Sequence, residues 1–276
     1  MALRATRLLG DAEVTLLTDG SYTFGPDLFP TTDEAGIRAL LATAGEHDIK
    51  TNFNAVLLRL GGKLVLADAG PRDLFGPACG KLPDALEEVG VTPDQIDTVF
   101  ATHMHPDHVA GMLTVDGAPA FPNAELVVTA EEHAFWSDDR FGGASVRMQD
   151  WARLAQQVFA AYGDRLRLIG AEDAIAPGLT ALPLPGHTPG HSGWRLESDG
   201  VQLLHAGDIV HAPVLQVRDP SIGIAFDIDM DAARVTRERL LDELATDNLL
   251  FTGGHFLHPA FHRVERFANG YRLKRP

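Results

Sequence analysis

The chain has 276 residues, of which 45% are hydrophobic and 22% are charged, and these fractions are ordinary for a soluble globular protein. They exclude a disordered chain, a collagen-like repeat and a coiled coil. The formal net charge is −15, and no cluster of basic residues offsets it. A field of this sign repels phosphate backbones, so we expect no nucleic-acid partner.

The apolar runs of the chain are short. The longest, such as 55–58 and 65–67, fall far below the roughly 18 residues of a membrane-spanning helix, so we expect no membrane partner. The segment 1–20 carries two arginines that no apolar stretch follows, whereas a secretory signal peptide needs one. We therefore predict a cytoplasmic protein. Cys79 is the only cysteine, so the chain forms no internal disulfide.

Strands and helices are predicted to alternate in the first half of the chain. The β-rich runs 55–60 and 63–68 flank Gly61-Gly62, which predicts a β-hairpin because both turn positions need positive φ. The elements predicted after this hairpin are a helix over 82–89 that ends at Gly90, a short strand over 98–102, a strand over 125–129 and a helix through 131–136.

The second half of the chain continues this alternation. Apolar residues recur at helical spacing over 149–162, which predicts one buried helix face. Further predicted elements are strands over 179–182, 192–196 and 201–205, a hairpin turn at Asp199-Gly200, a helix over 231–244 and a strand over 248–252. No break divides the sequence, so we expect one domain over 1–276. Strand hairpins mixed with helices indicate an α/β or α+β fold with largely antiparallel sheets.

Three imidazoles and a carboxylate lie within six positions, directly after the strand predicted at 98–102. His103 and His105 are two residues apart on extended chain, so their side chains project the same way and can converge on one ion. The turn at Pro106 can direct Asp107 and His108 toward a second point. Imidazole and carboxylate together suit zinc, iron, manganese or cobalt. Four such groups packed this tightly would be costly without a cation.

Three more candidate ligands lie where predicted strands end. His187 lies on a turn rich in glycine and proline, Asp208 follows the strand over 201–205, and His255 follows the strand over 248–252. Each of these signals is weak alone. Because each residue lies at a strand end, the three can contribute to one site together with the histidine cluster.

The order HxHxDH, H, D, H resembles the metallo-β-lactamase superfamily of binuclear metallohydrolases, and the likeness extends over 54–255. It implies an αββα sandwich, with two mainly antiparallel sheets flanked by helices and the metals at one edge between the sheets. It also implies two divalent ions, with Zn²⁺ expected and Mn, Co or Fe as substitutes. The implied ligands are His103, His105 and His187 for the first metal, Asp107, His108 and His255 for the second, and Asp208 as the bridge between them.

Flanking motifs resemble the methyl parathion hydrolase-like branch of this superfamily, which overlaps in sequence with the quorum-quenching lactonases. These motifs lie at 68–70, 75–77, 80–82, 121–124, 207–211 and 216–229. The stretch 256–262 departs from the branch, because it lacks the expected Pro-Gly-Ile-Gly type of ending. Relatives of this branch suggest a homodimer.

The resemblance implies a metal-dependent hydrolase of small ester-like substrates, namely lactones or phosphotriesters. Two metals about 3.5–4 Å apart share a water and lower its pKa toward 7, so the bridging hydroxide is the expected nucleophile. Asp107 is the candidate for orienting this hydroxide and passing a proton to the leaving group. His211 is the second candidate catalytic residue, because it can donate to a substrate oxygen. The N-acyl homoserine lactonases have a tyrosine at that place, three residues after the bridge. True β-lactamases generally lack the bridging aspartate, which disfavours antibiotic cleavage.

Several further functions remain open at this point. A thioester hydrolase of the glyoxalase II type would need a cationic site, for which Arg218 is the nearest candidate. An iron-dependent redox enzyme and a metal-stabilised binding protein without catalysis also fit the candidate ligands. The side chains that could orient the ligands are neutral histidines, Thr102 and Thr188. The aromatic residues that could line an apolar pocket, although core packing is favoured for each, are Phe135, Trp136, Phe141, Trp151, Phe226 and Phe256.

Overall fold

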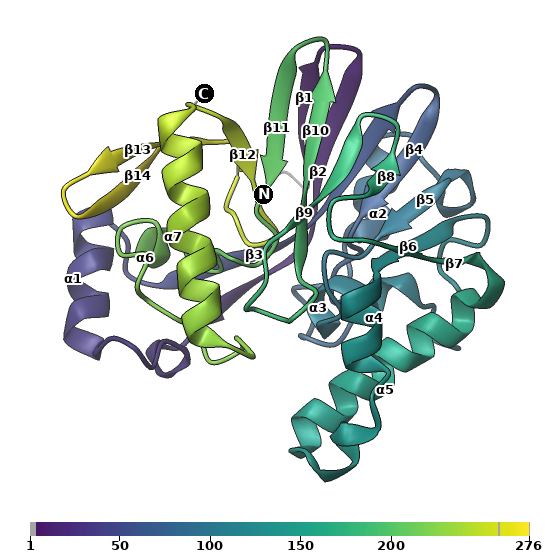
Figure 1. Cartoon of the computed structure of the whole chain (residues 1–276), viewed down its shortest axis with the longest axis horizontal. Coiled ribbons are helices and arrows are strands. Elements are labelled where there is room, and N and C mark those ends of the chain that lie inside the picture. Colours follow the sequence, from purple (N-terminus) through teal and green to yellow (C-terminus); the bar gives the residue numbers. More distant parts are fainter. Residues whose placement is uncertain (1–3, 259, 276) are drawn as a thin grey trace.

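The computed structural model describes residues 4–258 and 260–275. Residues 1–3 of the N-terminal segment, and Pro259 within the divergent stretch 256–262, lie outside the described residues. Two sheets face each other, and helices cover the outer side of each, with α1, α6 and α7 on one side and α2 to α5 on the other (Figure 1). This is the predicted αββα arrangement.

The larger sheet has seven strands in sequence order. They are β1 (Arg4–Leu9), β2 (Ala12–Phe24), β3 (Ile49–Leu60), β4 (Lys63–Ala67), β5 (Thr98–Phe100), β6 (Glu125–Thr129) and β7 (Leu166–Ile169). The pairings from β1 to β4 are antiparallel, and those from β4 to β7 are parallel. Half of this sheet is therefore parallel, which is a larger parallel share than the sequence indicated.

The smaller sheet has five strands in the order β12-β11-β10-β9-β8. They are β8 (Ala174–Ala176), β9 (Leu179–Pro183), β10 (Ser192–Ser198), β11 (Val201–His205) and β12 (Leu250–Thr252). Only the pairing of β11 with β12 is parallel. A separate antiparallel hairpin joins β13 (Arg263–Phe267) to β14 (Gly270–Lys274).

Seven α-helices accompany the sheets over the described residues. They are α1 (Glu34–Ala44), α2 (Leu82–Glu88), α3 (Pro106–Val109), α4 (Ala130–Trp136), α5 (Val146–Tyr162), α6 (Pro213–Gln216) and α7 (Met230–Thr246). Helix α5 begins three residues before its predicted start, because the Ser145 side chain accepts the Met148 N–H and caps it. Helix α7 lies on the smaller sheet, where Glu243 forms an ion pair with Arg195 of β10.

Both predicted hairpin turns are confirmed. Gly61 and Gly62 have φ of 55° and 82°, and Asp199 and Gly200 have φ of 48° and 75°. These left-handed conformations match the right-handed twist of the flanking strands. The sequence did not predict the strands β1, β2, β7 and β8, the helices α1, α3 and α6, or the β13–β14 hairpin.

Strand β3 is buried on both faces. Val56 and Leu58 pack between the two sheets, whereas Ala55 and Leu57 pack in the layer that contains α2 and α5. A strand covered on both sides reads as a continuous apolar run instead of an alternating one. The core between the sheets therefore holds them at a defined separation, which matters because the candidate site draws on both.

One edge of the sandwich collects the ends of many strands. Strands β4, β5 and β6 run parallel, so their carboxyl ends lie together. In the smaller sheet, β9, β11 and β12 end on the side where β10 begins, because β10 is antiparallel to its neighbours. The loops that carry the candidate ligands leave these strand ends.

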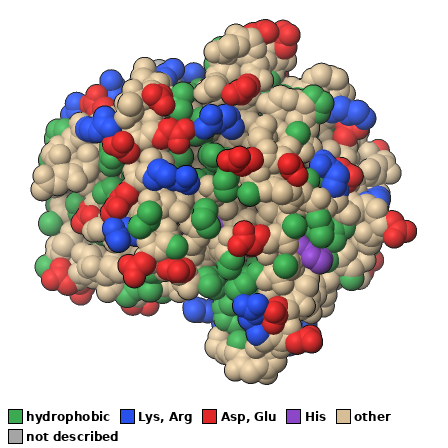
Figure 2. Space-filling view, viewed as in Figure 1, with side chains coloured by type: hydrophobic (Ala, Val, Ile, Leu, Met, Phe, Trp, Pro, Cys, Tyr) green, Lys and Arg blue, Asp and Glu red, His purple; other side chains and the backbone are tan. Residues whose placement is uncertain are grey.

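Charges are interspersed over the surface. On the face in Figure 2, acidic and basic side chains alternate, and no broad basic area is visible among the described residues. None of the described helices has the length and apolar composition needed to cross a bilayer.

Candidate metal centre

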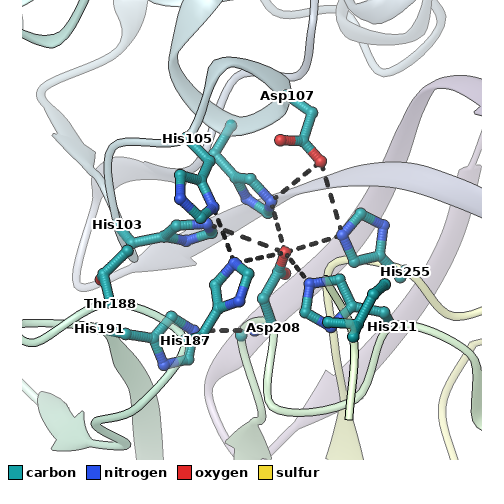
Figure 3. Close-up of polar contacts among 12 residues, drawn as sticks. His103, His105, Asp107, His187, Thr188, His191, Asp208, His211 and His255 are labelled. Carbon is teal, nitrogen blue, oxygen red and sulfur yellow. Dashed lines mark hydrogen bonds and ion pairs between the residues drawn. The ribbon is translucent and has the colours of Figure 1, made fainter. Parts of the chain in front are cut away.

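The structure brings all eight predicted site residues together at this edge, around the carboxylate of Asp208 (Figure 3). The loop after β5 supplies His103 and His105, and α3 supplies Asp107 and His108. The remaining members come from loops of the smaller sheet, namely His187 after β9, Asp208 and His211 after β11, and His255 after β12. The site therefore lies at the seam between the two sheets.

The three residues predicted for the first metal form one group, whose ligand atoms lie within 4.8 Å of one another. Nδ1 of His105 is 2.8 Å from Nε2 of His187. Nε2 of His103 has no hydrogen-bond partner although it is buried. These nitrogens face a common point, as ligands of a single ion would.

The residues predicted for the second metal form another group with Asp208. Oδ2 of Asp208 is 3.0 Å from Nε2 of His108 and 2.8 Å from Nε2 of His255. Oδ2 of Asp107 is 3.5 Å and 3.6 Å from the same two nitrogens. The Asp208 oxygen also lies 3.8 Å from Nε2 of His103 and 3.7 Å from Nε2 of His187, so it reaches both groups.

The protonation of the first group suits cation binding. Burial holds the pKa of His103 and His187 well below the ordinary value and lowers that of His105 to about 3, so all three are neutral imidazoles with free lone pairs. In the second group, burial lowers the pKa of His108 and His255, but the carboxylates of Asp208 and Asp107 outweigh it and raise the pKa of both, so a bound metal would displace their protons. Burial raises the pKa of Asp208, but the neighbouring imidazoles of His108, His255 and His211 outweigh it and hold the pKa well below its usual range. The donor set and the orphaned His103 Nε2 fit divalent metal ions.

The second ring nitrogen is held by a defined acceptor in four of the five ligand histidines, whereas Nε2 of His105 is buried without a hydrogen-bond partner. The pairs are His103 Nδ1 with Thr102 Oγ1 at 3.1 Å, His108 Nδ1 with Asp68 Oδ2 at 2.9 Å, His187 Nδ1 with Asp227 Oδ1 at 2.9 Å, and His255 Nδ1 with the Asn52 carbonyl at 2.9 Å. Such partners orient a metal-binding imidazole and select its tautomer.

The sequence predicted Thr102 in such a role but missed Asp68, Asp227 and Asn52. The hydroxyl of Thr188, also predicted to orient a ligand, instead donates to Glu132. A signal for Asp68 was present, because an aspartate at the end of an apolar strand, directly before the glycine-containing turn 69–70, is unusual in a core. Its φ of 60° places it in the left-handed region, which aspartate tolerates better than most residues.

The backbone of Asp208 is held by His191. The Asp208 N–H donates to His191 Nε2 at 2.8 Å, and His191 Nδ1 donates to the Leu184 carbonyl at 2.6 Å. Gly207 has φ of 50°, and a Cβ there would lie 2.4 Å from His191 Nε2. Glycine is therefore required before Asp208, which explains why the Gly207-Asp208 pair stands at the end of β11.

His211 lies at the base of the site. Its Nε2 is 3.2 Å from Oδ2 of Asp208, and its ring stacks on that of His255. Its Nδ1 is buried without a hydrogen-bond partner. His211 also forms a potential ligand group with His187 and Asp208, so its position suits contact either with a metal or with a substrate oxygen.

A cavity of about 210 Å³ opens onto these residues. Its walls are mostly aromatic, and the aromatic residues are Tyr22, Phe24, Phe53, Phe75, Trp151 and Phe226. The described residues that line it include no lysine or arginine, although Arg147 lies over the rings of Trp151 and Phe226, 5.2 Å and 5.9 Å from their centroids. Trp151 and Phe226 thus line the pocket, whereas Trp136, Phe141 and Phe256 are buried in the core and Phe135 is partly buried against it. Arg218 lines a different groove and donates to the carbonyls of Phe267 and Tyr271.

Comparison with known proteins identifies the family. The family model described as "Metallo-beta-lactamase superfamily" matches residues 52–255, so the chain belongs to this superfamily. A Mycobacterium tuberculosis protein named a "probable metallo-hydrolase" is 29% identical over 132 residues, which cover 45% of this chain and 40% of that protein. An N-acyl homoserine lactonase of Bacillus thuringiensis is 24% identical over 119 residues, which cover 43% of this chain and 40% of that protein. The matched region thus spans less than half the length of these curated relatives.

Solved structures agree with this family over nearly the whole chain. The hydrolase AbOPH of the β-lactamase superfamily superposes with a TM-score of 0.93 and 28% identity, covering 99% of this chain and 97% of that one. AidC, a dizinc quorum-quenching lactonase in complex with a product, gives a TM-score of 0.91 and the same coverage at 24% identity, which shows the fold. The chain is therefore a member of the metallo-β-lactamase superfamily, and the relatives that it resembles are named as a metallo-hydrolase and a lactonase.

Proposed function

We propose that this protein hydrolyses small, uncharged ester-like substrates, with lactones as the first candidate class, at a centre of two divalent metal ions. The observation that carries the proposal is the convergence of five imidazole nitrogens within 3.8 Å of one Asp208 oxygen, beneath an aromatic cavity that reaches them. Lactones are favoured because curated relatives are named as N-acyl homoserine lactonases. The ions would be held by His103, His105 and His187, by Asp107, His108 and His255, and by Asp208 between them.

The bound metals would supply a water of lowered pKa and polarise the ester oxygen. Asp107 is suited to handle the proton, because its side chain is 18% exposed and lines the cavity. Burial raises its pKa, but His108 and His255 outweigh this effect and lower it, so the group is an ionised acceptor. It can take a proton from the attacking water and pass it to the leaving oxygen. His211, which also lines the cavity, is placed to donate to a substrate oxygen.

The cavity itself restricts the substrate. Aromatic walls exclude water and accept apolar groups, whereas the described lining residues include no lysine or arginine for an acidic substrate. This argues against a thioester that carries an acidic tripeptide. Phosphotriesters, the second candidate class, are also uncharged and suit aromatic walls when they carry aryl groups.

The test combines two measurements on one preparation. Metals per chain are counted by elemental analysis, and the same sample is assayed against a lactone, a phosphotriester, a glutathione thioester and a β-lactam. We expect two divalent ions per chain with lactone or phosphotriester turnover. One iron per chain without hydrolysis would overturn the proposal in favour of redox chemistry. Two ions without turnover of any ester would favour a binding protein.

A further inference from the structure

Glu132, in the first turn of α4, is a carboxylate buried without any exposed surface. Its Oε1 accepts the Met104 N–H at 2.9 Å and the Trp136 indole N–H at 2.6 Å. Its Oε2 accepts the Thr188 hydroxyl at 2.6 Å. All of these described donors are uncharged, so the carboxylate is retained in the core by hydrogen bonds instead of an ion pair. Burying such a group is costly unless its bonds are made, so these contacts need an explanation.

Two of the donors belong to loops that hold predicted ligands of the first metal, and the third packs against one of these ligands. Met104 lies between His103 and His105, and Thr188 directly follows His187. The ring of Trp136 meets the ring of His105 edge-on, with centroids 5.6 Å apart. One carboxylate therefore contacts the surroundings of all three ligands.

The backbone around these contacts is packed closely. A Cβ on Gly190 would lie 2.1 Å from the Glu132 nitrogen, so the loop after His187 lies directly against α4. The Thr129 hydroxyl donates to the Gly190 carbonyl at 2.8 Å in the same region. These contacts join a loop of the smaller sheet to a helix of the larger one, and they place the backbone of Glu132 directly against this loop.

We propose that Glu132 is a positioning residue that holds the three ligands of the first metal in convergence. The inference rests on the two-metal centre proposed above. Glu132 acts through the Met104 amide, the Thr188 hydroxyl and the Trp136 ring, and it touches neither metal nor substrate. The second-metal histidines have separate supports, because His108 bonds to Asp68 and His255 bonds to the Asn52 carbonyl. Loss of Glu132 therefore weakens the first metal selectively.

Two variants of Glu132 test whether its hydrogen bonds position the metal ligands, because one variant keeps these bonds and the other removes them. In Glu132→Gln the amide oxygen can accept the Met104 and Trp136 donors, while the amide nitrogen can donate to the Thr188 oxygen, so we expect metal binding near that of the wild type. In Glu132→Ala all three bonds are lost, and we expect the affinity for the first metal to fall about 10- to 100-fold, the usual cost of removing a group that orients metal ligands. The affinity for the second metal should change less than about threefold.

Zn²⁺ titrated into metal-free protein, followed by isothermal calorimetry, gives both affinities. Cobalt-substituted protein gives absorption bands that report the ligand geometry of each site. Asp19→Asn is the matched control. Asp19 is likewise a buried carboxylate, but it accepts the backbone N–H groups of Gly80 and Leu82, which belong to none of the loops that hold a predicted ligand. It should leave both Zn²⁺ affinities unchanged. If Glu132→Ala does not fold, Thr188→Val removes one bond alone and should weaken the first site severalfold.

The outcomes distinguish this inference from the proposed function. Two results would overturn the positioning role while leaving the two-metal centre intact. In the first, Glu132→Ala binds Zn²⁺ as the wild type does. In the second, Glu132→Ala loses affinity equally at both sites and Glu132→Gln does not restore it. A wild-type stoichiometry of one ion would instead contradict the two-metal centre. In that case, loss of the single ion in Glu132→Ala but not in Asp19→Asn would still support the role of Glu132.

Discussion

The contact between Asp68 and His108 allows a sharp test of the second metal site. Asp68 Oδ1 accepts the Thr102 N–H at 2.9 Å, and its Oδ2 accepts from His108 Nδ1 at 2.9 Å. With the proton on Nδ1, the His108 Nε2 lone pair is free for a metal. Asp68→Asn keeps the size of the side chain and tolerates the left-handed φ of 60°, so backbone strain does not change.

The substitution reverses the hydrogen bond. If the side-chain carbonyl of the introduced asparagine replaces Oδ1 and keeps the Thr102 N–H, its NH₂ group faces His108 Nδ1. The imidazole must then accept at Nδ1 and carry its proton on Nε2, where it blocks the metal. Loss of such a partner costs about 10- to 100-fold in metal affinity, which corresponds to about 1.4–2.7 kcal/mol. The first metal should be affected much less, because His108 is not among its predicted ligands.

The assay is a site-resolved Zn²⁺ titration of the metal-free protein, with thermal unfolding to show that the variant folds. Asp227→Asn is the reciprocal variant, because Asp227 Oδ1 accepts from His187 Nδ1 at 2.9 Å and should affect the first metal instead. Opposite patterns in the two variants would support the assignment of ligands. A second-site affinity within about threefold of the wild type in Asp68→Asn would refute the reasoning.

Other predictions concern single residues. Asp208→Ala should lower the metal content and abolish turnover, and full metal occupancy at the wild-type rate would remove Asp208 as the bridge. His211→Phe should impair turnover far more than metal content, and an unchanged rate would make His211 a structural residue. Burial raises the pKa of Cys79 to about 11, so at pH 8 its thiolate fraction, and its rate with a disulfide reagent, should be about a hundredfold below those of the unfolded chain. Burial lowers the pKa of His205 from 6.5 to about 4, so its stabilising contribution is complete above pH 6.5 and is lost toward pH 4. The unfolding free energy of the metal-free wild type should therefore fall between pH 7 and pH 4, and in His205→Asn this fall should be smaller by about 3 kcal/mol. An equal fall in the variant and the wild type would contradict this.

The ligands were predictable because their chemistry is concentrated in the sequence. His103, His105, Asp107 and His108 are near neighbours, and the other candidates stand at strand ends beside glycine. Their hydrogen-bond partners were not predictable by the same route. Asp68 and Thr102 meet because β4 and β5 are parallel neighbours with Ala67 opposite Phe100. Predicting this contact requires the order of the strands in the sheet, which the sequence pattern does not give. The partner of His255 is a backbone carbonyl, which any residue type provides.

Strand β2 shows why part of the fold was missed. Its 13 residues include Asp19 and Gly20, which interrupt the apolar pattern. The pairing with β3 shifts register between Thr18 and Gly20, and such an irregularity reverses the face on which later side chains lie. A period-two pattern therefore does not persist along the strand. Asp19 is nevertheless accommodated, because it accepts two backbone N–H groups from the segment 80–82.

The supports of the two metal groups are separate except at two places. Thr102 Oγ1 contacts both Asp68, which holds His108, and the ring of His103, so it links the second group to the first. Asp208 Oδ2 reaches both groups, and its backbone is held by His191 from the smaller sheet. Each group draws ligands from both sheets, so the packing of the sheets affects both groups, whereas the orientation of each ligand depends on its own hydrogen-bond partner. Substitutions at Asp68 and Glu132 should accordingly have additive effects on metal affinity, whereas a substitution at Thr102 should couple the two sites.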